Sequence, residues 1–116
     1  MLASEVPREQ WDLFLARFNE AHSGASARVE RHQPGHGIIF EVSNCVFQRI
    51  HDDCSGDHHR MGVVVGEPQQ NQETFLMTDP QMLVWSQEQA VHTLQIFGTD
   101  GRCLVVRLVS KIQAAA

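Results

Sequence analysis

Residues 91–110, VHTLQIFGTDGRCLVVRLVS, contain two apolar, β-branched runs on either side of Asp100–Gly101. An Asp-Gly pair suits a tight turn with positive φ, so the stretch predicts a β-hairpin. Side chains alternate between the two faces of a strand, so each arm has one predominantly aliphatic face. These faces are formed by Leu94 and Ile96 in the first arm, and by Leu104, Val106 and Leu108 in the second.

The opposite faces of the same two arms are also partly apolar. They carry Val91, Phe97, Val105 and Val109. Apolar residues on both sides of a strand indicate a central position or a covered second side. We therefore expect these four residues to form a homodimer contact or a groove for a protein partner.

Short strand-like runs continue upstream as far as Ala25, separated by turn residues. No helical pattern lies between them, so parallel crossover connections are not expected and the sheet should be mostly antiparallel. The runs predict a sheet of about seven strands over residues 25–110. The sheet should be strongly curved or partly closed into a barrel.

A helix is expected before the sheet, over residues 7–22. Pro7 suits the first helical position, and Gly24 is a suitable stop. One buried stripe recurs at helical spacing through Trp11, Phe14, Leu15 and Phe18. The fold class is thus α+β, with the helix packed over one face or one open end of the sheet. We expect a single domain over residues 1–116, with a disordered tail at 113–116.

Charge, hydropathy and cysteine content limit the cellular compartment and the classes of partner that we expect. The net charge is −5, and the nine Lys and Arg residues form no basic run, so a nucleic-acid partner is not expected. No window approaches the ~18 apolar residues of a membrane span, and no signal peptide is recognisable at the N-terminus. The three cysteines, Cys45, Cys54 and Cys103, imply no disulfide framework. These features favour a cytoplasmic protein with reduced thiols.

The opening VPREQWDLFLARFNEAHSG resembles that of a family of short bacterial proteins catalogued as a domain of unknown function. Members begin with Ile or Val, then Pro-Arg, two variable residues and Trp, and end in a hairpin like LQIFGTDG followed by an apolar strand. The firmest matches are Val6-Pro7-Arg8, Trp11 and Asp100-Gly101. The resemblance implies one domain with an N-terminal helix and a sheet, and it implies no activity, cofactor or partner.

The stretch HDDCSGDHH, residues 51–59, is rich in metal-ligating side chains, unlike the ordinary charged turn of that family. If Ser55–Gly56 is a two-residue turn, one face of the hairpin carries Asp52, Cys54, Asp57 and His59. This set offers the four N, S and O donors of a Zn²⁺ site. The spacing matches no strong zinc pattern such as paired C-x₂-C units, so a solvated turn is the competing interpretation.

Catalytic motifs are scarce. Cys54 lies beside His51 and His58, which suits a thiol nucleophile, but the sequence identifies no orienting group or oxyanion site. Neither a P-loop nor a nucleophile-elbow motif is present. The sequence therefore favours a non-catalytic binding or interaction module. The alternatives are a metal-binding or metal-sensing protein that uses residues 51–59, and an enzyme of unknown class.

Overall fold

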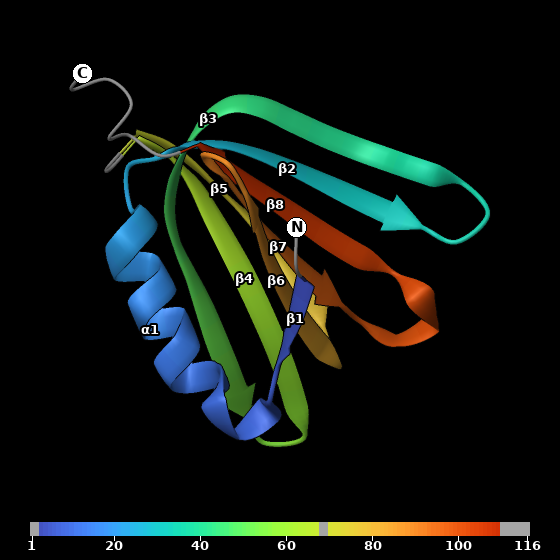
Figure 1. Ribbon diagram of the computed structural model, residues 1–116. Coiled ribbons are helices and arrows are strands. Elements are labelled where there is room, and N and C mark those ends of the chain that lie inside the picture. Colours follow the sequence, from blue (N-terminus) through green and yellow to red (C-terminus); the bar gives the residue numbers. More distant parts are fainter. Residues whose placement is uncertain (1–2, 68–69, 110–116) are drawn as a thin grey trace.

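A computed structural model describes residues 3–67 and 70–109, in which one helix packs against a single antiparallel sheet (Figure 1). Its elements are β1 (Ala3–Val6), the 3₁₀ turn η1 (Arg8–Gln10), α1 (Trp11–His22), β2 (Ser26–Gln33), β3 (Gly37–Ser55), β4 (His58–Glu67), β5 (Gln70–Thr78), β6 (Met82–Glu88), β7 (Val91–Phe97), the 3₁₀ turn η2 (Thr99–Gly101) and β8 (Cys103–Val109). The strand order is β1-β6-β7-β8-β2-β3-β4-β5.

The α+β class and the antiparallel sheet are as predicted, but the described sheet has eight strands instead of about seven. The addition is β1, which pairs with β6 and which the sequence did not distinguish from a lead-in to the helix. The strand order is linear, with β1 and β5 at its edges, so the sheet is not closed. The expected tail at 113–116 lies outside the described residues.

Strand β3 gives the sheet its shape. It pairs with β2 through residues 37–46 and with β4 through residues 47–55, and Asn44 near the change of partner has a φ of 57°. The strand-like runs on either side of Asn44 therefore form one long strand. Figure 1 shows β3 running beside β2 and then turning down beside β4. The strands β4 and β5 are thereby carried away from the plane of β2 and β8.

The core fills the space enclosed by this bend. It is one cluster in which alternate residues of β4 pack with the inner faces of β7 and β8. The predicted faces of the last hairpin are confirmed, since Leu94 lies opposite Val106 and Ile96 lies opposite Leu104. From the helix, Trp11, Leu15 and Phe18 are buried, whereas Phe14 is only partly buried.

Helix α1 lies beside the second half of β3, where β2 no longer covers the strand. The carboxamide of Asn19 donates to the Ile50 carbonyl at 2.8 Å and accepts from the Ile50 N–H at 2.7 Å. The segment after the helix continues this pairing, because Gly24 N–H donates to Phe47 O and Phe47 N–H donates to Ala25 O. The helix thus satisfies backbone groups that a neighbouring strand would otherwise satisfy. Among the described residues, no helix has both the length and the apolar character needed to span a membrane.

Candidate functional site

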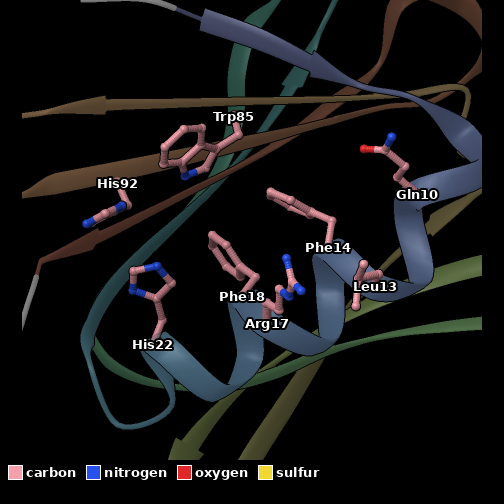
Figure 2. A pocket seen from close by; sticks show the side chains of 8 residues that line it. All are labelled: Gln10, Leu13, Phe14, Arg17, Phe18, His22, Trp85 and His92. Atoms are coloured by element: carbon pink, nitrogen blue, oxygen red, sulfur yellow. The ribbon is translucent and has the colours of Figure 1, made fainter.

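A cleft of about 280 Å³ opens between α1 and the strands β6 and β7 (Figure 2). It is lined by Gln10, Leu13, Phe14, Arg17, Phe18, His22, Trp85 and His92. Six of these residues come from η1 and α1, while Trp85 and His92 come from the sheet. The helix therefore leaves part of its contact with β6 and β7 unfilled.

Stacked and tilted rings form the wall of the cleft. The ring centroids of Phe14 and Phe18 lie 5.7 Å apart, and those of Phe18 and His22 lie 4.6 Å apart. The row continues from the helix to the sheet through His22 and His92, whose ring centroids lie 4.4 Å apart. The ring centroids of His92 and Trp85 lie 6.2 Å apart. The Phe14–Phe18 spacing is that of a favourable aromatic pair, and the wall of the cleft consists largely of ring faces.

The polar groups of the cleft are the Gln10 carboxamide, the Arg17 guanidinium and the imidazoles of His22 and His92. Burial, and then the neighbouring His92, lowers the pKa of His22, and burial lowers the pKa of His92. Both imidazoles are consequently neutral at pH 7. The Nδ1 atom of His92 is buried and has no hydrogen-bond partner among the described residues. A buried polar atom without a partner costs about 1–3 kcal/mol.

The sequence predicted none of these residues as a site. The stripe that contains Phe14 and Phe18 indicated only core packing, and Trp85 and His92 lie far along the chain. The one available signal was that His22 extends the stripe by one helical turn beyond Phe18, placing a titratable group on an otherwise apolar face.

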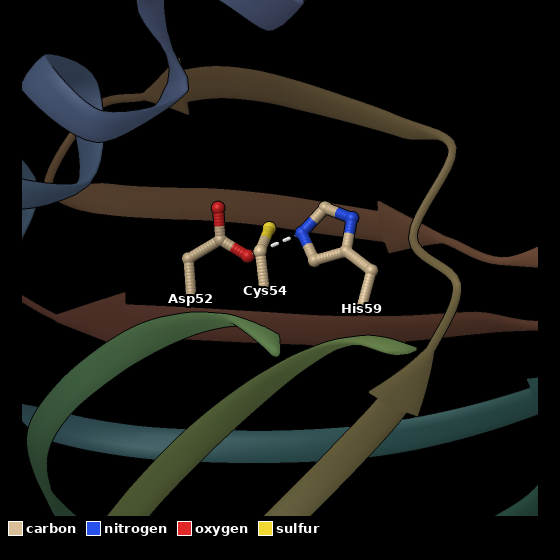
Figure 3. Close-up of side chains that lie close together, drawn as sticks. All are labelled: Asp52, Cys54 and His59. Carbon is tan, nitrogen blue, oxygen red and sulfur yellow. Dashed lines mark hydrogen bonds and ion pairs between the residues drawn. The ribbon is translucent and has the colours of Figure 1, made fainter. Parts of the chain in front are cut away.

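A second cluster lies at the tip of the β3–β4 hairpin, where three of the four predicted metal ligands come together (Figure 3). One ligand atom from each of Asp52, Cys54 and His59 lies within 4.8 Å of the others. The prediction was wrong for Asp57, because the turn consists of Gly56 and Asp57 instead of Ser55 and Gly56. Cys54 therefore pairs directly with His59, while Asp57 lies in the turn.

The cluster is held by a polar pair and by the start of the helix. His59 Nε2 bonds to the Asp52 carboxylate, and these side chains are only 18% and 13% exposed. The Trp11 ring lies 6.0 Å from the His59 ring. Figure 3 shows the Cys54 sulfur on the side of the His59 ring that faces Asp52. Three different donors thus converge on one small volume.

This arrangement does not activate Cys54 as a nucleophile. Desolvation, followed by the negative charges of Asp52, Asp12 and Asp53, raises the pKa of the Cys54 thiol, and Arg8 opposes the rise only in part. A reactive cysteine needs a lowered pKa and a base directed at its sulfur. The nitrogen that faces Cys54 is already bonded to Asp52.

The four predicted interface residues share the outer face of β7 and β8, as expected, but they do not form a continuous apolar patch. Val105 is buried, Val91 and Phe97 are half-buried, and Val109 is exposed. Polar side chains separate them and share a surface depression of about 450 Å³ with Val91 and Val105; they include Thr93, Gln95 and Arg107. The homodimer or partner contact stays a prediction.

The same outer face holds an ionic cluster around the buried carboxylate of Glu30. Its carboxylate lies 2.6 Å from Arg107, 2.9 Å from His32 and 3.1 Å from Arg28. Burial by itself raises the pKa of Glu30, but the hydrogen bonds from Arg107 and His32 and the two arginine charges outweigh burial and lower the pKa. Because every partner belongs to the sheet, the cluster has a structural role in joining β2 to β8.

Comparison with known proteins identifies the fold class of the chain but no family. The chain has the architecture of a small α+β protein in which an N-terminal helix packs on one bent antiparallel sheet. The crystal structure of the Bacillus subtilis YojF protein is similar to it, with a TM-score of 0.56 over 96% of each chain and 9% sequence identity. No protein-family model matches the chain, and no curated protein matches it.

Proposed function

We propose that this protein is a non-catalytic binding module whose ligand is a small aromatic molecule with a negative charge, held in the cleft between α1 and β6–β7. The observation that carries the proposal is the row of rings along the cleft, together with the guanidinium of Arg17 in its lining. Ligand pockets combine apolar walls with a few polar groups that fix orientation, and this cleft has that composition.

The size of the cleft limits the ligand. At about 280 Å³ it is slightly smaller than the pockets of drug-sized molecules, which start near ~300 Å³, so a single or fused ring is the suitable size. Phe14, Phe18 and Trp85 supply faces against which such a ring can stack.

The charge of the ligand follows from Arg17, His22 and His92, which contribute only cationic or neutral nitrogen groups. A guanidinium pairs with a carboxylate through two parallel hydrogen bonds. Among the described residues that line the cleft there is no carboxylate and no thiol. This composition favours holding an anion over attacking a bound molecule.

Binding can be tested by NMR titration of the ¹⁵N-labelled full chain with benzoate. Acetate retains the charge without the ring, and benzyl alcohol retains the ring without the charge. We expect benzoate to bind with a Kd of ~1 mM, as suits a ligand of few atoms, and to shift the indole N–H of Trp85. Acetate and benzyl alcohol should bind several-fold more weakly.

Variants at two arginines separate the cleft from general surface charge. Arg17→Gln should weaken benzoate about threefold or more and leave benzyl alcohol unchanged, because only the ion pair is lost. Arg102→Gln, at an exposed arginine after η2, is the matched control and should behave as wild type. Equal shifts with acetate, or shifts that bypass Trp85, would refute the proposal.

A further inference from the structure

The β3–β4 tip brings three kinds of metal-ligating atom together on one face. Cys54 and His59 are directly opposite each other in the ladder, and Asp52 lies two residues from Cys54 on the same strand. Side chains in these positions share a face of the hairpin. The cluster is separate from the helix–sheet cleft, and the two share no residue.

We infer that Asp52, Cys54 and His59 bind one Zn²⁺ ion, with water in the fourth position. Ligand atoms around a tetrahedral zinc lie roughly 3.3–3.7 Å apart, given bonds of ~2.0–2.3 Å. The three donor atoms already lie within 4.8 Å of one another. Small side-chain rotations on the hairpin adjust these separations: Cys54 moves inward, and the His59–Asp52 hydrogen bond opens and is replaced by a bond from each residue to the ion.

The chemistry of the donors selects the metal. A thiolate with an imidazole suits zinc, whereas Mg²⁺ and Ca²⁺ require oxygen ligands. On binding, the Cys54 thiol transfers its proton to solvent and the sulfur forms the bond to zinc. Asp52 and Cys54 then contribute two negative charges, which balance the ion, while His59 binds as the neutral imidazole.

The same hairpin supplies its own controls. Asp53 and His58 lie on the opposite face, where they line a different surface depression with Ser55 and Arg60. They repeat two of the three ligand types only a few residues away. A specific site must depend on one face of the hairpin, whereas adventitious chelation by surface histidines must involve both faces.

The test uses the untagged full chain, loaded with Zn²⁺, desalted and titrated against a chromophoric chelator. We expect one Zn²⁺ per chain. Cys54→Ala and His59→Gln should each raise the Kd about tenfold or more, and Asp53→Asn and His58→Gln should leave it within about twofold. Co²⁺ in place of Zn²⁺ should give a sulfur-to-cobalt charge-transfer band that Cys54→Ala abolishes. Circular dichroism of each variant confirms that the fold is retained.

Three results would overturn the inference. One is less than half an equivalent of zinc on the wild-type chain. Another is unchanged affinity in the folded Cys54→Ala variant. The third is equal weakening by His58→Gln and His59→Gln. None of these results bears on benzoate binding, because none of the metal ligands lines the cleft.

Discussion

Replacing Asn19 by alanine tests how the helix is attached to the sheet. The Asn19 carboxamide makes two hydrogen bonds, of 2.8 and 2.7 Å, to the carbonyl and the N–H of Ile50. Strand β2 has left β3 before this point, so no sheet neighbour replaces the lost partner. Asn19→Ala should leave both backbone groups of Ile50 unsatisfied beside a helix that limits access of water.

The expected loss of stability is about 2 kcal/mol. Two partly buried hydrogen bonds contribute about 0.5–1.5 kcal/mol each, and a backbone group left unpaired adds to the cost. Alanine is a better helix former than asparagine by roughly 0.5 kcal/mol, which offsets part of the loss. For a chain of this size, the melting temperature should fall by roughly 6–12 °C.

Urea denaturation followed by circular dichroism measures the effect directly. Asn19→Asp is an informative second variant, because it retains an acceptor for the Ile50 N–H but has no donor for the Ile50 carbonyl; it should also destabilise. Glu20→Ala, at the next and exposed helical position, is the control and should change stability by less than about 0.5 kcal/mol. A loss below about 0.5 kcal/mol for Asn19→Ala would refute the proposed attachment.

Three further predictions concern pH, charge and backbone. Burial lowers the pKa of His92 below 6.5, so the unfolded chain takes up a proton at this residue before the folded chain does. The free energy of unfolding should therefore fall as the pH drops from 7.5 to 5.5, and His92→Gln should reduce this pH dependence in urea titrations. Glu30→Gln should lower the free energy of unfolding by about 1–3 kcal/mol, because the buried Glu30 oxygens accept from charged donors. Glu41→Gln, at the exposed carboxylate that pairs with Arg28, should lower it by less than about 0.5 kcal/mol; thermal melting measures both. Gly66→Ala should lower the free energy of unfolding by more than about 2 kcal/mol, since Gly66 has a φ of +118° and a Cβ there would lie 2.5 Å from a backbone oxygen. Gly35→Ala, in open space at a φ of +78°, should lower it by about 1 kcal/mol.

Features encoded within a few residues could be predicted from the sequence. The aromatic stripe predicted the helix, which forms over Trp11–His22 after a 3₁₀ turn. Asp100 and Gly101 both have positive φ, as the hairpin required. The hairpin loop is longer than predicted, since the last pair is Phe97 with Cys103. The predicted alternation of faces is nevertheless retained, since Leu94 lies opposite Val106.

The predicted set of four metal ligands was wrong at Asp57, because the turn was predicted one residue too early. Gly56 has a φ of 61°, which suits the first central position of a type II′ turn, so the turn begins at Gly56 and not at Ser55. The shift moves the partner of Cys54 from Asp57 to His59. Asp52 and His59 remain on one face in either register, so three of the four ligands still come together.

The cleft could not be predicted, because its two walls are joined only by tertiary packing. Nothing near Trp85 or His92 in the sequence indicates that these residues face a helix some seventy positions earlier. The position of that helix depends on β3 leaving β2 after Val46, a change of partner that no local pattern specifies. Periodicity identified the buried stripe, but it could not show where the packing is incomplete.

The break between β2 and the second half of β3 therefore determines more than the shape of the sheet. Because β2 leaves, β3 needs a new partner, and α1 supplies it through Asn19. A helix placed there brings Trp11 against His59 at one end and His22 against His92 at the other. A loss of the Asn19 attachment should thus disturb both candidate sites together, although they share no residue. The two sites are related through the position of one rigid element and not through direct contact.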